Sequence, residues 1–235
     1  MIVSTDPDYL DTKLIKQGAK ELEPVLKELA DWIQKKYTTP VLNIYCDKID
    51  TDQERPRINI IFEYCSDVEK FRDNIGNYDT KKQNSIADQF RLIVKSTSIP
   101  NLNLSPELFT KVHSSLEIER LLVIFSAFEP IVREEINHKI PQAEIDGLKK
   151  ALAAKNVWEI FREFATTTVF FETDKQIEDY RKSGILEQIQ NIYFRLLKRY
   201  DEFDYIKHDT SILNFDSREN FEMNFESNWF YYSRR

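Results

Sequence analysis

Long stretches with apolar residues at spacings of three and four alternate along this chain with short runs of β-branched and aromatic residues. The first pattern is typical of amphipathic helices and the second of strands. Together they predict an α+β fold in which long amphipathic helices pack on short antiparallel sheet segments, arranged in two lobes.

In the first half, residues 9–37 form one apolar stripe, and Pro24 either kinks that helix or begins a second one. Residues 41–47 and 58–64 predict an antiparallel hairpin with a charged loop. Ser66 predicts the N-cap of a short helix because Glu69 follows at the capping-box spacing. A further helix is expected over 80–95.

In the second half, the apolar run 116–128 fits a buried helix or a buried strand, and we favour the helix. Four further helical and strand segments follow, at 129–140, 145–164, 166–172 and 174–205. The third of these, TTTVFFE, is the clearest strand, and Thr173 with Asp174 predicts the cap of the helix after it, which is interrupted near Gly184. Two closing strands are expected at 211–216 and 228–233.

The uncharged segment 96–106 contains two prolines and predicts a connection at 100–106 between lobes 1–99 and 107–235. Residues 62–72 and 171–181 share four identities without a gap, so the lobes are candidates for an internal repeat. The alternative is that any strand followed by a capped amphipathic helix places similar residues at these offsets.

No basic leader with an apolar core is present, and no apolar run is long enough to span a bilayer, so we expect a cytoplasmic protein without a membrane partner. Cys46 and Cys65 lie in apolar strand-like runs, where we expect two core thiols and no disulfide.

The chain contains four glycines, each isolated from the others, which excludes the clustered glycines of phosphate-binding loops. We therefore expect no nucleotide cofactor. His113, His138 and His208 lie far apart, and the Glu135–His138 spacing is only half of a di-iron helix motif, so no metal is expected. A net charge of −7 disfavours nucleic acid as a ligand.

Catalytic arrangements remain open as an alternative. His113 stands beside two serines, but a catalytic triad is assembled from separate elements. Scattered carboxylates with an arginine, for example Glu172, Asp174, Arg181 and Asp216, would suit a hydrolase or nuclease of unrecognised family.

The C-terminal stretch 200–232 contains ten aromatic and eight acidic residues against two basic ones. Aromatic side chains supply contact area, and acids steer a basic partner. We predict partner-binding roles for seven residues of this stretch: Asp204, Asp216, Glu219, Glu222, Glu226, Trp229 and Tyr231. The alternative is that most of the aromatics are core residues of edge strands.

These features predict a non-catalytic binding module of the immunity or antitoxin kind, which neutralises a basic toxin or effector by stoichiometric binding. Besides the hydrolase, a homodimeric regulatory or adaptor protein joined through its C-terminal strands is the remaining alternative.

Overall fold

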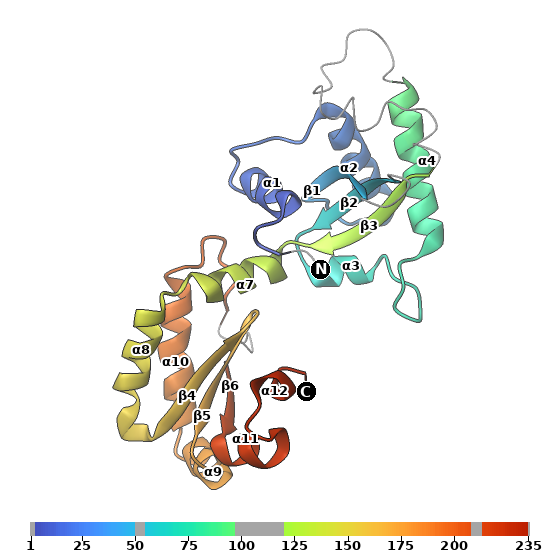
Figure 1. The fold of residues 1–235 in the computed structure, drawn as a ribbon. Coiled ribbons are helices and arrows are strands. Elements are labelled where there is room, and N and C mark those ends of the chain that lie inside the picture. Colours follow the sequence, from blue (N-terminus) through green and yellow to red (C-terminus); the bar gives the residue numbers. More distant parts are fainter. Residues whose placement is uncertain (1–2, 50–54, 97–119, 208–212, 235) are drawn as a thin grey trace. The chain divides into compact units, whose positions relative to one another are not determined.

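The computed structural model describes residues 3–49, 55–96, 120–207 and 213–234 (Figure 1). The chain forms two compact units, Met1–Pro130 and Ile131–Arg235. Each unit surrounds a three-stranded sheet with helices, which confirms the α+β class. The predicted connection at 100–106 lies outside the described residues. Strand β3 (Leu122–Ala127), which follows it, belongs to the sheet of the first unit.

The sheet of the first unit is mixed rather than antiparallel, with strand order β1-β2-β3. β1 pairs antiparallel with β2 as the hairpin prediction requires, and β3 pairs parallel to β2. The elements before β3 are α1 (Pro7–Lys16), α2 (Pro24–Tyr37), β1 (Asn43–Ile49), β2 (Arg55–Phe62), α3 (Cys65–Glu69) and α4 (Thr80–Ser96).

Both faces of this sheet are covered. Ile58, Ile60 and Phe62 project from one face of β2 into a core built with α2, α3 and α4. Asn59 projects from the opposite face, where its Nδ2 donates to Asp8 Oδ2 of α1 at 3.0 Å. Helix α1 therefore packs on the second face through buried polar contacts as well as apolar ones.

The second unit contains a sheet of order β4-β5-β6, in which β4 and β5 are antiparallel and β6 is parallel to β5. Its elements are α7 (Glu129–Lys139), α8 (Gln142–Ala151), the 3₁₀ turn η1 (Ala153–Lys155), β4 (Val157–Glu163), β5 (Thr166–Phe171), α9 (Asp174–Lys182), α10 (Ile185–Lys198), β6 (Leu213–Ser217), α11 (Arg218–Phe225) and α12 (Trp229–Tyr232). Among the described residues, no helix combines the length and the apolar character needed to cross a bilayer.

Over the described residues, the two units share one topology: an antiparallel hairpin, two helices and a third strand parallel to the second. Phe62 and Phe171 occupy equivalent positions at the ends of β2 and β5. Phe62 stacks on Phe71 with ring centroids 4.8 Å apart, and Phe171 contacts Tyr180 at 5.3 Å. The similarity between residues 62–72 and 171–181 therefore coincides with a repeated structural unit.

Three predicted segments differ from the structure. The predicted helix 145–164 ends at Ala151, because residues 157–163 instead pair with β5. The predicted helix 116–128 is a strand where it is described, with Val123, Phe125 and Ala127 alternately buried. The predicted strand 228–233 is one helical turn, α12, because the side chain of Asn228 caps it by accepting from the N–H of Phe230 at 2.9 Å.

Smaller differences concern helix ends and the thiols. Helix α3 begins before Ser66, with Tyr64 as its N-cap, and α10 ends at Lys198 rather than near 205. Thr173 is the N-cap of α9, as predicted, and its hydroxyl accepts from the N–H of Gln176. Cys46 is buried, whereas Cys65 is exposed rather than in the core, and the two form no disulfide with each other.

Candidate functional site

The C-terminal helices α11 and α12 are anchored to one face of the second sheet by aromatic rings. Trp229 stacks on Phe221 at 4.1 Å and on Phe161 of β4 at 4.5 Å between ring centroids. Phe170, Phe221 and Tyr232 are buried at the centre of this aromatic cluster. Trp229, predicted to contact a partner, thus packs within the unit and is only partly exposed.

Asp216 of β6 also holds α11 and α12, through hydrogen bonds. Its Oδ2 accepts from the hydroxyl of Tyr232 at 2.6 Å, and its Oδ1 accepts from Asn220 Nδ2 at 2.8 Å. The hydroxyl of Ser217 caps α11 by accepting from the Asn220 N–H at 2.8 Å. In this structure Asp216 holds α11 and α12 on the sheet.

The segment of α11 and α12 exposes large apolar side chains and acids. Met223, Phe230 and Tyr231 are 75%, 56% and 50% exposed. Glu222 and Glu226 are exposed on the same segment, and Glu222 pairs with Arg218 at 2.7 Å. We refer to these five residues, Met223, Phe230, Tyr231, Glu222 and Glu226, as the C-terminal face.

Two further predicted residues have local partners. Glu219 Oε2 accepts from the backbone N–H of Asp174 at 3.1 Å, at the N-terminus of α9. Asp204 is paired with Lys198 and Lys207, and these two ammonium groups lower the pKa of its carboxyl to about 2. Asp204 is therefore ionised and locally neutralised.

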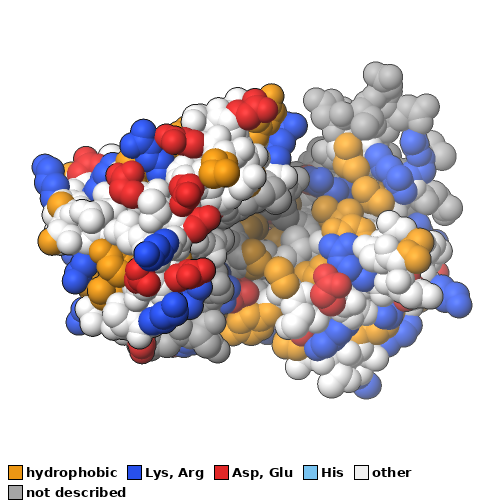
Figure 2. Space-filling view, turned by 90° about the horizontal axis from the view of Figure 1, so that it is seen from below, with side chains coloured by type: hydrophobic (Ala, Val, Ile, Leu, Met, Phe, Trp, Pro, Cys, Tyr) orange, Lys and Arg blue, Asp and Glu red, His pale blue; other side chains and the backbone are white. Residues whose placement is uncertain are grey.

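Charges of both signs are interspersed over the view of the second unit in Figure 2, the unit on the left, seen from the side on which Figure 1 places α9 and α11. A single large acidic field is not visible on that side. Among the acids predicted to bind a partner, Glu222 and Asp204 are paired with basic side chains, which favours short-range pairing over long-range steering.

The alternative catalytic group is brought together only in part. Asp174 Oδ1 accepts from the hydroxyl of Ser217 at 2.5 Å, next to Asp216 at the carboxyl ends of β5 and β6. Glu172 lies 3.7 Å from Arg218. Arg181 is in the last turn of α9, about 10 Å along the helix axis from Asp174. The described hydrogen bonds of Asp174 and Asp216 cap helices and anchor side chains.

Within the described ranges, no group of three or more His, Cys, Asp or Glu side chains is arranged to hold a metal ion. Glu135 pairs with Lys139 at 3.2 Å, and His138 lies 4.0 Å from Glu134. His113 and its neighbouring serines lie outside the described residues, as does His208.

Comparison of this chain with models of protein families, with curated proteins and with solved structures gives no match.

The sequence did not lead us to predict that Met223 and Phe230 are exposed. Helical spacing would have found Met223, because it stands two residues from both Phe221 and Phe225 and so lies on the opposite side of α11 from these rings. Phe230 is exposed because α12 is a helical turn, which the sequence did not predict.

Proposed function

We propose that this protein is a non-catalytic protein-binding module, and that its C-terminal face contacts a basic protein partner. The observation that carries the proposal is the exposure of Met223, Phe230 and Tyr231 on helices whose inner side is fastened to the sheet. Exposed large apolar side chains on a rigid support are typical of interaction sites.

The charge of the site favours a basic partner. Glu222 and Glu226 are exposed on the same segment as the apolar residues, and the whole chain carries a net charge of −7. Acids at the rim of an interface select a partner with Lys and Arg and set its orientation. We further propose the immunity or antitoxin class, in which the cytoplasmic protein neutralises a basic toxin or effector by stoichiometric binding.

Affinity capture from the native cell tests this proposal. The triple variant Met223→Ser, Phe230→Ser, Tyr231→Ser removes apolar contact area without touching the aromatic cluster. We expect the wild-type chain to retain a basic partner in one-to-one ratio and the triple variant to lose it, because buried apolar side chains at an interface centre each contribute about 1–2 kcal/mol or more.

The matched control is Ile75→Ser with Leu92→Ser, two exposed apolar residues of the first unit, which should leave capture unchanged. Replacing Glu222 and Glu226 by glutamine should weaken capture most at low salt, since screening already reduces the contribution of these charges at high salt. Capture that is equal for the wild-type and triple variants, at every salt concentration, rejects this surface as the binding site.

A further inference from the structure

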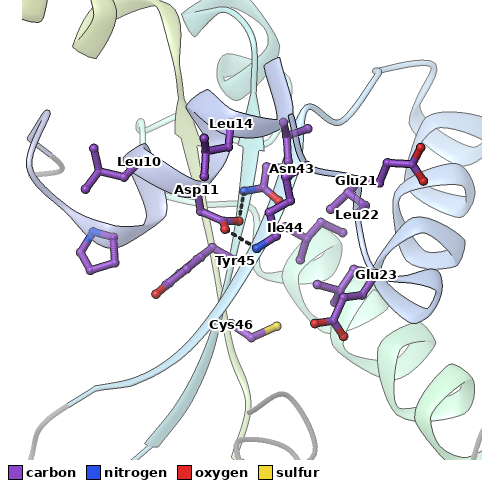
Figure 3. Close-up of a pocket in the computed structure, with 14 residues that line it drawn as sticks. Leu10, Asp11, Leu14, Glu21, Leu22, Glu23, Asn43, Ile44, Tyr45 and Cys46 are labelled. Atoms are coloured by element: carbon purple, nitrogen blue, oxygen red, sulfur yellow. Dashed lines mark hydrogen bonds and ion pairs between the residues drawn. The ribbon is translucent and has the colours of Figure 1, made fainter. Parts of the chain in front are cut away.

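A groove of about 410 Å³ runs along β1 in the first unit (Figure 3). Leu10, Asp11 and Leu14 of α1 lie on one side of the strand, and residues 21–23 before and at the cap of α2 lie on the other. β1 is an edge strand, with a described neighbouring strand on one side only. The volume is that of a site for a side chain or a short peptide segment.

Two acceptor oxygens in the wall of this groove receive no hydrogen bond from the described part of the chain. Asn43 is 1% exposed, and its Nδ2 donates to Asp11 Oδ2 at 3.1 Å and to Thr12 Oγ1 at 3.0 Å, which fixes the amide with Oδ1 unpaired. Glu23 Oε2 is likewise buried and unpaired. A buried acceptor without a donor is costly, so both oxygens favour a ligand that supplies N–H groups.

The charge of the groove favours a cation. Asp11, Glu21 and Glu23 line it against one basic residue, Lys20, which pairs with Asp11. Leu10 and Leu14 are 49% and 45% exposed and supply an apolar wall beside the carboxylates.

In the second unit, an arginine occupies the strand position that is equivalent to Cys46 of β1. Cys46 pairs with Ile58, four residues before the end of β2, and Arg162 pairs with Thr167, four residues before the end of β5. Arg162 of β4 therefore stands where the first unit has Cys46. Both residues line pockets on the edge strand of their own sheets.

The guanidinium of Arg162 donates three hydrogen bonds around the start of α8. It reaches the carbonyl oxygens of Asn137 and Ile140 at 2.9 and 2.8 Å and Gln142 Oε1 at 3.0 Å. Pro141, between two of these acceptors, is the N-cap of α8, and Glu23 is the N-cap of α2. At the N-cap of α2, the first unit thus has the acceptor Glu23 Oε2. Its edge strand β1 carries no arginine that could donate to this oxygen.

We infer that the groove along β1 binds a guanidinium group carried by an extended, arginine-bearing segment of another protein. The guanidinium donates to Glu23 at the cap of α2, apolar side chains of the segment pack on Leu10 and Leu14 of α1, and the segment runs along the edge of β1. This site belongs to the first unit and does not depend on the C-terminal face.

The probe is a fluorescein-labelled heptapeptide of alternating valine and arginine, titrated against the full chain by fluorescence anisotropy. We expect saturable one-to-one binding, no binding of the same peptide with glutamate for arginine, and slower amide exchange of β1 in the complex. Glu23→Gln should weaken binding about tenfold, because a charge-assisted hydrogen bond contributes about 1.4 kcal/mol or more.

Leu14→Lys places a positive charge in the groove and should weaken binding at least as much, whereas Leu92→Lys, on an exposed leucine of α4, should not. The triple variant of the C-terminal face should bind the peptide as the wild type does, so failure of one proposal is distinguishable from failure of the other. Absent binding, or binding unchanged by Glu23→Gln and Leu14→Lys, overturns the inference.

Two further outcomes overturn the assignment of the occupant. Equal affinity for methylguanidinium and for the peptide would make the groove a site for a small cation. A concentration-dependent mass in light scattering that Leu14→Lys abolishes would make the occupant a second copy of this chain.

Discussion

At the scale of single residues, the hydroxyl of Tyr232 is the clearest link between the C-terminal helices and the sheet. It is buried and donates to Asp216 at 2.6 Å. Removing this hydroxyl leaves a partly buried carboxylate oxygen without that donor, so both partners of the bond contribute to the placement of the C-terminal face.

Tyr232→Phe is therefore expected to lower the free energy of unfolding by about 1.5–3 kcal/mol, the usual range for hydrogen bonds to charged groups. Urea denaturation measures the change. Tyr231→Phe is the matched control, since Tyr231 is half exposed, and it should leave the unfolding midpoint unaltered. Equal midpoints for the wild type and Tyr232→Phe would remove Asp216 from its anchoring role.

Asp204 carries the pH dependence that the structure predicts most directly. Lys198 and Lys207 lower its pKa from 3.8 to about 2 in the folded protein. The folded state binds this proton less readily than the unfolded state, so the stabilisation is present above pH 4 and is lost as the pH falls through 2.

The test is an NMR titration of the Asp204 carboxyl carbon. We expect a midpoint near 2 in the wild type and a midpoint closer to the ordinary value in Lys198→Met, because Lys198 is the stronger of the two partners. A wild-type midpoint near 3.8 would show that the two lysines do not hold this carboxylate in solution.

The sequence indicated the composition of the C-terminal stretch, and the binding roles assigned to its residues stay predictions. It indicated that aromatic and acidic side chains gather near the C-terminus, and they do. It placed Trp229 and Asp216 among the binding residues, whereas the structure packs the first in an aromatic cluster and hydrogen-bonds the second to Tyr232. Composition does not distinguish the two sides of a helix until the helix itself is predicted.

At the scale of elements, β1, β2, β5 and β6 were predicted as strands, whereas β3 and β4 were predicted as helical. The hairpin of β1 and β2 and the strand β5 follow from β-branched and aromatic runs. Residues 157–163 carry apolar residues at helical spacings, but they form β4 because β5 offers an antiparallel partner. Tertiary pairing overrides local propensity here.

Helix α12 has only four residues, so its stability depends on packing rather than on its own backbone. Trp229→Ala removes the ring that stacks on both Phe161 and Phe221. We expect a loss of about 3 kcal/mol in the free energy of unfolding, at the low end for truncation of a packed aromatic because Trp229 is partly exposed.

Amide hydrogen exchange should show faster exchange throughout α11 and α12 in this variant. The control is Phe230→Ala, which truncates an exposed aromatic of the same turn and should change stability by less than about 0.5 kcal/mol. Similar losses in the two variants would mean that the aromatic cluster does not secure the helix.

At the scale of the whole molecule, the C-terminal face could be anticipated from the sequence. The groove along β1 could not, because its interpretation depends on the repeated topology. The C-terminal face was indicated by an unusual local composition. The groove along β1 became recognisable only when β1 and β4 were aligned through their pairing with β2 and β5. Position 46 follows Ile-Tyr and position 162 follows Ile-Phe, and the strand register establishes that the two positions are equivalent.

Native mass spectrometry of the protein purified gently from its own cells tests the central claim, that this chain works by binding a basic protein. The account predicts a one-to-one complex of the 28.0 kDa chain with a basic protein, which the triple variant of Met223, Phe230 and Tyr231 no longer forms. A single species at 28.0 kDa, or one at about twice that mass composed only of this chain, would contradict it.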